Sequence, residues 1–227
     1  MSIRSYLKNK KQTHFQIRGI EVFVKDEITD PKISIKNVIQ TIIKKVPSHL
    51  MRKVKSINIG QFSFLASRDL QASYKNSKIF VTNEQKSEKD MLDDIIHEIA
   101  HSVEELYPDF LYLDKNLEKE FLAKRKNMWN VLTSKGYELD LSSFLNPRYD
   151  RKLDMMLYQE IGYPILSILT ASIFHSPYAA TSLSEYFADA FEAFYMREEL
   201  DRLKGISPKL YEKIVKLTFA NKEKTHD

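Results

Sequence analysis

Two histidines and a glutamate occur together in the run His97-Glu98-Ile99-Ala100-His101. Residues four apart lie on one face of a helix, so His97 and His101 would point the same way and could bind one ion. A zinc ion lowers the pKa of its bound water to about 7, and a nearby carboxylate can then accept the water's proton. The motif therefore predicts that His97 and His101 are zinc ligands and that Glu98 is the general base.

A helix from about Glu88 to Leu106 is expected to carry this motif. Its apolar side chains recur at helical spacing and form one stripe, made of Leu92, Ile95, Ile96, Ile99, Val103 and Leu106. The two histidines lie opposite this stripe, which suits a helix with its back on a sheet and its front lining a cleft. The alternative is that a short H-E-x-x-H pattern falls on a solvated helix face by chance.

A third metal ligand is needed, because catalytic zinc usually takes three from the protein. The chain has no cysteine, and no histidine follows His101 at the short spacing of a third histidine ligand. A carboxylate from the segment SLSEYFADAFEAFY is the remaining option. We expect Glu185 to bind the metal and Asp189, one turn later, to hydrogen-bond the far nitrogen of a ligand histidine. The alternative for Glu185 is a capping box with Ser182.

These motifs resemble those of gluzincin-type zinc metallopeptidases, and more narrowly the protease domain of anthrax lethal factor and the Pro-Pro endopeptidases. Those proteins combine H-E-x-x-H with a later helix of the form E-[FY]-F-A-[DE]-A-F, which here is Glu185 to Phe191. They also place a tyrosine seven residues before the ligand glutamate, which here is Tyr178. The resemblance covers the strands and helix before His97 and the stretch from Tyr178 onward.

The resemblance implies a zincin-like fold and a role for each motif residue. His97, His101 and Glu185 would be the ligands, Glu98 the base, and the Tyr178 hydroxyl would stabilise the oxyanion. The alternative for Tyr178, one of twelve tyrosines, is a packing role. The segment between His101 and Tyr178 is longer than in compact members, so family substrate preferences are not carried over. Regulatory zincins that cleave repressors fit less well, because their later helix follows the histidines sooner.

The elements before the motif must position it. We expect a strand in 17–27, a helix between Pro31 and Pro47, a strand in 54–65, and two short strands around a turn at 75–77. One of the latter is predicted to be an edge strand that takes substrate as an added strand, and it comprises Gln71, Ala72, Ser73 and Tyr74.

The predicted fold class is α+β and zincin-like. A small mixed, twisted sheet would have a backing helix on one face and the active-site helix across the other, followed by a mostly helical C-terminal lobe. The expected divisions are a flexible basic arm over 1–16, a zincin subdomain over 17–106, and a helical subdomain over 107–227.

Composition limits the possible partners. Apolar residues make up 43% of the chain and charged residues 29%, as in ordinary globular proteins. The net charge of +4 is small and the lysines are scattered, so no nucleic-acid partner is expected. No signal peptide or membrane span is recognisable, so the default expectation is a cytoplasmic protein without membrane contact; virion association and non-classical export are alternatives. A monomer is one oligomeric state that the sequence allows.

The sequence thus predicts a zinc-dependent endopeptidase that binds one Zn²⁺ per chain and hydrolyses a protein or peptide substrate. Two other functions stay open. One is a non-catalytic zincin-fold binding or structural module, such as a virion or toxin-type component. The other is an amidase that acts on a non-protein peptide.

Overall fold

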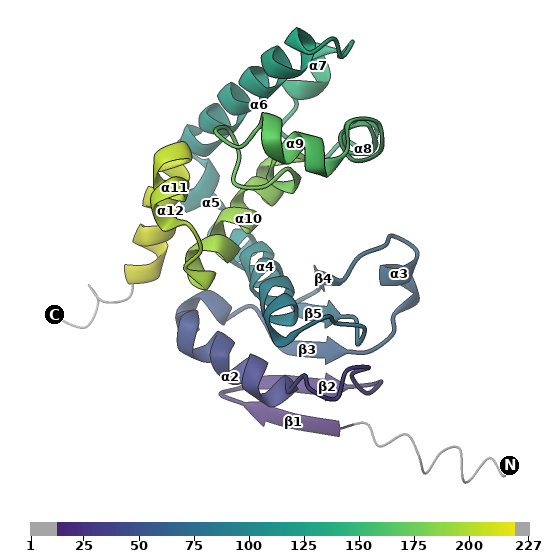
Figure 1. Cartoon of the computed structure of the whole chain (residues 1–227). Coiled ribbons are helices and arrows are strands. Elements are labelled where there is room, and N and C mark those ends of the chain that lie inside the picture. Colours follow the sequence, from purple (N-terminus) through teal and green to yellow (C-terminus); the bar gives the residue numbers. More distant parts are fainter. Residues whose placement is uncertain (1–12, 221–227) are drawn as a thin grey trace, which may run out of the picture. The chain divides into compact units, whose positions relative to one another are not determined.

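The chain divides into two compact units between Leu106 and Tyr107, and this division coincides with the expected one (Figure 1). The computed structural model describes residues 13–220. The fold class is α+β, as predicted, with a five-stranded mixed sheet in the first unit and helices in both. Residues 1–12 of the predicted arm lie outside the described residues. Residues 13–16 were assigned to the arm wrongly, because they form part of a strand.

The sheet of the first unit has the strand order β1-β2-β3-β5-β4. The outer pairs, β1 with β2 and β4 with β5, are antiparallel, whereas β2, β3 and β5 run parallel. The strand bounds are Thr13–Ile17, Ile20–Val24, Ser56–Ile59, Ala72–Lys75 and Lys78–Val81 for β1 to β5. The predicted edge strand, β4, therefore lies at one end of the sheet, displaced by one residue from the expected range.

Two predicted strands are wrong in extent. The expected strand over 17–27 is the second half of a hairpin, because Arg18 and Gly19, with φ of 49° and 85°, form a two-residue turn between β1 and β2. Arginine is not the usual first residue of such a turn, so the sequence indicated a hairpin at this position only weakly. The expected strand over 54–65 ends at Ile59 and is followed by the short helix α3 (Ser63–Ala66).

The two long helices of the first unit pack on the same face of the sheet, so the predicted placement on opposite faces is wrong (Figure 1). Helix α2 (Ile35–Lys45) contacts α4 (Glu88–Leu106), which contacts β4 and β5. Only one face is strongly apolar, with Val22, Ile57 and Ile79 aligned across the strands and fully buried. The other face carries polar residues and aromatic rings, so the two helices share the apolar face.

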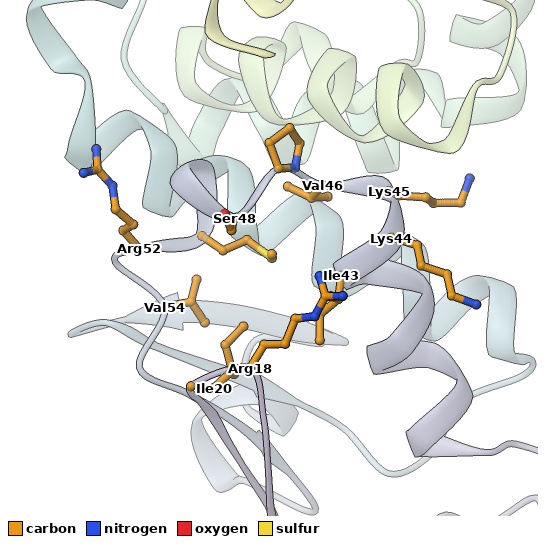
Figure 2. A pocket seen from close by; sticks show the side chains of 12 residues that line it. Arg18, Ile20, Ile43, Lys44, Lys45, Val46, Ser48, Arg52 and Val54 are labelled. Atoms are coloured by element: carbon orange, nitrogen blue, oxygen red, sulfur yellow. The ribbon is translucent and has the colours of Figure 1, made fainter. Parts of the chain in front are cut away.

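A pocket of about 380 Å³ opens between the β1–β2 turn and the end of α2 (Figure 2). Its lining includes the apolar side chains of Ile20, Val46 and Val54. Lys44 and Lys45 belong to the last turn of α2, and Figure 2 shows both pointing away from these apolar side chains. Cations at a helix C-terminus offset its partial negative charge, which accounts for the two lysines.

The second unit is helical within its described residues, in agreement with the predicted lobe. Its elements are α5 (Pro108–Tyr112), α6 (Asn116–Ser134), α7 (Leu141–Phe144), α8 (Arg151–Met155), the π-helical η2 (Met156–Ile161), α9 (Tyr163–Leu169), η3 (Tyr178–Ala180), α10 (Leu183–Met196), α11 (Leu200–Ile206) and α12 (Pro208–Phe219). Its core includes the fully buried rings of Phe121, Phe174, Phe187 and Phe191. Over residues 13–220, no helix has the length and apolar character that a bilayer crossing requires.

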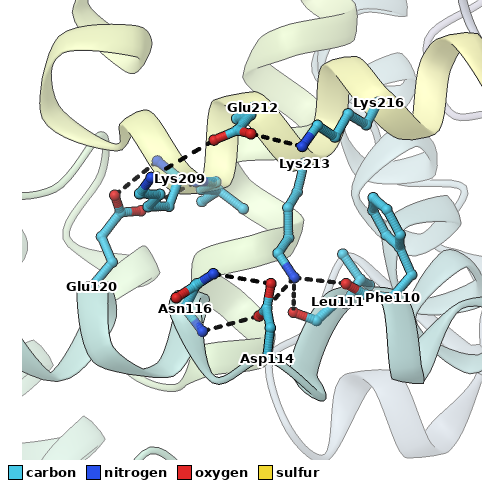
Figure 3. Close-up of polar contacts among 10 residues, drawn as sticks. Phe110, Leu111, Asp114, Asn116, Glu120, Lys209, Glu212, Lys213 and Lys216 are labelled. Carbon is cyan, nitrogen blue, oxygen red and sulfur yellow. Dashed lines mark hydrogen bonds and ion pairs between the residues drawn. The ribbon is translucent and has the colours of Figure 1, made fainter.

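A buried lysine joins the last helix of this unit to its first (Figure 3). Lys213 of α12 is 7% exposed, and its ammonium group donates to the carbonyls of Phe110 and Leu111 at 2.6 and 2.8 Å. Asp114 lies 2.9 Å from the same nitrogen. These contacts satisfy carbonyls at the end of α5, where a helix lacks internal partners.

Candidate metal centre

Helix α4 has the predicted bounds and carries His97, Glu98 and His101. One potential ligand atom from each of these residues lies within 4.8 Å of the others. The two imidazole rings are 5.2 Å apart between centroids and inclined at 75°. Two imidazoles one helical turn apart are a donor set that suits zinc, so these residues fit the predicted ion.

Glu104 supports His101, and sequence reasoning missed it. The Nδ1 atom of His101 lies 2.9 Å from Oε2 of Glu104, three residues later on the same helix. A carboxylate at Nδ1 fixes the tautomer and ring orientation, and it directs Nε2 toward a metal. The signal was present as an acidic residue one turn after the second histidine of the motif.

Glu98 is held beside the edge strand of the sheet. Its side chain is almost buried, at 8% exposure, and its Oε2 accepts the backbone N–H of Tyr74 at 2.5 Å. The same tyrosine donates its hydroxyl to Glu105 at 2.6 Å, further along α4. Burial, followed by this contact with Glu105, raises the pKa of Tyr74 to about 12. Strand β4 is thereby fixed against the helix that carries the candidate ligands.

The remaining predicted residues belong to the second unit. Tyr178 begins η3, and Glu185 lies in the first turn of α10. Ser182 is the N-cap of α10, and its hydroxyl accepts the N–H of Glu185 at 3.1 Å. The serine half of the alternative capping box is therefore present, and it leaves the ligand role of Glu185 as a prediction.

Asp189 lies one turn after Glu185 and contacts a histidine outside the motif. Its Oδ1 accepts the hydroxyl of Ser176 at 2.5 Å, and its Oδ2 is 3.6 Å from Nδ1 of His175. The contact with Asp189 raises the pKa of His175, although burial opposes the shift. The predicted hydrogen bond from Asp189 to a ligand histidine stays a prediction.

The chain matches no protein-family model, no curated protein and no solved structure in the comparisons made with each. The expected resemblance to gluzincins therefore stays a prediction that depends on the motif residues alone. Among the predicted residues, the contacts described above bring together His97, Glu98 and His101 with Tyr74 of the edge strand.

Proposed function

We propose that this protein is a zinc-dependent endopeptidase of the gluzincin type, in a zincin-like fold. One observation carries the proposal: His97, Glu98 and His101 cluster on α4, and Glu98 is bonded to the edge strand β4. The proposed ligands are His97, His101 and Glu185, the last on its sequence pattern alone. Zinc, when bound, would supply a Lewis acid that activates water and polarises the scissile carbonyl.

Glu98 acts as the general base in this proposal. The Tyr74 amide bonds Oε2 of Glu98, so the carboxylate is held in one orientation beside the histidines. The low exposure of Glu98 places its carboxylate in a medium of lower dielectric constant than water. Its interactions with other charges are therefore stronger than they would be in water. The Glu104 carboxylate similarly holds the His101 ring. The side chains that meet a substrate are thus oriented before it binds, which lowers the cost of reaching the transition state.

The substrate is a polypeptide bound in extended form along β4. An edge strand presents backbone groups that pair with an added strand, and in β4 these exclude the Tyr74 N–H, which Glu98 already accepts. Glu98 bonds the backbone of the same strand, so a peptide added to β4 passes close to the proposed base. Such binding depends mainly on backbone groups and accepts a range of side chains.

A peptide library, with cleavage read by mass spectrometry, tests the proposal. We expect the zinc-loaded chain to cleave peptides at internal bonds, and we expect a chelator to abolish cleavage and added zinc to restore it. Elemental analysis should find about one zinc per chain, and His97→Ala should lose it. Equal zinc in both proteins, or cleavage that a chelator leaves intact, contradicts the proposal.

Replacement of Glu98 separates catalysis from metal binding. An amide does not accept the proton of water, so Glu98→Gln should lower hydrolysis about 10²–10⁴-fold. The zinc content should stay that of the wild type, because the two histidines are unchanged. If the glutamine variant kept full activity, Glu98 would have no part in the mechanism; if it lost zinc, Glu98 would be a ligand.

A further inference from the structure

Helix α6 lies in the segment between His101 and Tyr178. Its polar side chains contact α10, the helix that carries Glu185, and the residues that precede α10. The Lys124 ammonium group donates to the carbonyl of Ile173 at 2.5 Å. Glu120 accepts the hydroxyl of Tyr186 at 2.9 Å. Arg125, the residue after Lys124, reaches the turn that connects Tyr178 to α10. All these residues belong to the second unit.

Arg125 is fully buried and holds three backbone carbonyls. Its Nη1 donates to the carbonyls of Ala180 and Thr181 at 2.9 and 3.3 Å, and its Nη2 donates to that of Ser143 at 2.7 Å. Its guanidinium carbon also lies over the rings of Phe121 and Phe144, at 5.3 and 5.5 Å from their centroids. The side chain thus joins α6, α7 and the turn before α10.

The environment of this arginine makes its carbonyl contacts necessary. Within residues 13–220, no carboxylate lies at ion-pair distance from the guanidinium group. A buried charge is costly unless it is paired or hydrogen-bonded, so the carbonyls compensate this one, together with the more distant charge of Asp150. Burial lowers the pKa of Arg125 to about 10, which leaves it charged at neutral pH. Movement of the turn would therefore deprive a buried charge of two of its three carbonyl partners.

The turn itself is closed by local hydrogen bonds. The N–H and the hydroxyl of Thr181 both donate to the carbonyl of Tyr178, at 3.0 and 2.8 Å. The N–H of Leu183, at the start of α10, donates to the carbonyl of Pro147 at 2.8 Å. The two bonds from Thr181 close the turn on Tyr178, so a hold on Ala180 and Thr181 constrains Tyr178 directly. It constrains the start of α10 through the one residue, Ser182, that separates Thr181 from Leu183.

We propose that Arg125 is a positioning residue, which fixes the 178–182 turn and through it the placement of Tyr178 and Glu185. The long segment between His101 and Tyr178 then has a definite task, because α6 and α7 form the support against which this turn is held. The effect of Arg125 on metal binding rests on the proposed function, in which Glu185 is a zinc ligand. The anchoring of the turn by Arg125 does not depend on the proposed function. The anchoring and its effect on metal binding can therefore be tested separately.

Arg125→Met tests the anchor, because methionine fills similar space but donates no hydrogen bond. Lys213→Met is the matched control, since Lys213 is also a buried cation bound to two carbonyls of the second unit, but at α5. Hydrogen exchange of the metal-free proteins reports on the amides of Ala180, Thr181 and Leu183. In Arg125→Met, we expect exchange at these three amides to accelerate more than exchange at the later amides of α10. In Lys213→Met, we expect exchange at the three amides to stay unchanged.

Zinc affinity then tests the consequence for the metal site. Loss of a group bonded directly to a metal ligand weakens metal binding about 10–100-fold, and Arg125 acts less directly, so we expect a loss no larger than this in Arg125→Met and none in Lys213→Met. Arg125→Lys, which keeps the charge but not the forked geometry, should give intermediate exchange and affinity. If Arg125→Met does not fold, Arg125→Lys takes its place in the measurements of hydrogen exchange and zinc affinity.

Three results overturn the inference. Unchanged exchange at the turn in the arginine variants removes the anchor. Equal acceleration throughout the second unit, or in Lys213→Met, shows general destabilisation instead. Local acceleration with unchanged zinc affinity removes the link to the metal site. If the wild type itself binds no zinc, the proposed function fails, and hydrogen exchange still decides whether Arg125 anchors the turn.

Discussion

Two adjacent acidic residues on α4 have different partners. Glu104 pairs with the imidazole of His101, whereas Glu105 lies 3.0 Å from the Lys53 ammonium group and accepts the hydroxyl of Tyr74. The contacts with Tyr74, then Lys53, lower the pKa of the Glu105 carboxyl. Only Glu104 is therefore placed to orient a candidate metal ligand, although the two residues are neighbours of the same type.

Glu104→Gln should weaken zinc binding about 10–100-fold, because an amide orients the His101 imidazole less strongly than a carboxylate does. Glu105→Gln is the matched control and should keep the wild-type affinity. Competition with a chromogenic chelator measures both variants. Equal affinities in the two would show that the contact between His101 and Glu104 does not support the metal.

Tyr178→Phe tests the proposed oxyanion contact. Removal of one oxyanion donor typically lowers kcat by about 10²–10³, and the KM and the zinc content should be nearly unchanged. Steady-state kinetics on a peptide from the library measures both constants. A phenylalanine variant with wild-type kcat would assign Tyr178 to packing.

At the scale of elements, the start of α10 distinguishes two roles for Glu185. A glutamine can replace a glutamate in a capping box, so Glu185→Gln should unfold at nearly the wild-type temperature if it only caps. A ligand role predicts that the same variant loses zinc. Zinc content and thermal unfolding, measured on one preparation, separate the roles, and retention of zinc with full affinity excludes Glu185 as a ligand.

Ser182→Ala probes the cap itself. The Ser182 hydroxyl satisfies the N–H of Glu185, and loss of such a cap typically costs about 0.5–2 kcal/mol of stability. Denaturant unfolding should show this decrease, and Ser182→Thr, which keeps the hydroxyl, should recover most of it. Identical unfolding of the alanine variant and the wild type would show that the cap contributes nothing.

At the scale of the molecule, His175 should make stability depend on pH. Its pKa is raised above 6.5, chiefly by Asp189; Glu199, 3.9 Å away, acts in the same sense, whereas burial and Arg202 oppose the shift. A histidine whose folded pKa is raised contributes its full stability below the unfolded pKa of 6.5. That contribution is lost as the pH rises through the folded pKa.

Thermal unfolding between about pH 6 and 8, where histidine titrates, should therefore show a falling Tm. Fluorescence of Trp129, the chain's single tryptophan, reports on the second unit, because it lies in α6. His175→Gln should flatten this dependence. If the variant showed the same slope as the wild type, another group would be responsible.

The sequence by itself determined the features that depend on local pattern. Helix α4 has its predicted bounds because its apolar stripe and its histidines repeat at helical spacing along one continuous segment. The acidic position in the first turn of α10 follows from spacing in the same way. The α+β class and the helical character of the second unit also follow from periodicity, which adjacent residues set.

Only the tertiary structure decided which distant groups meet. The bond from the Tyr74 amide to Glu98, and those from Arg125 to Ala180 and Thr181, involve backbone groups 24, 55 and 56 residues away. Every residue except proline carries the same backbone donor and acceptor, so no residue type marks these partners in advance. Helices α2 and α4 likewise share one face of the sheet, because the aligned strands make only that face apolar. This alignment depends on the register between strands that are far apart in sequence.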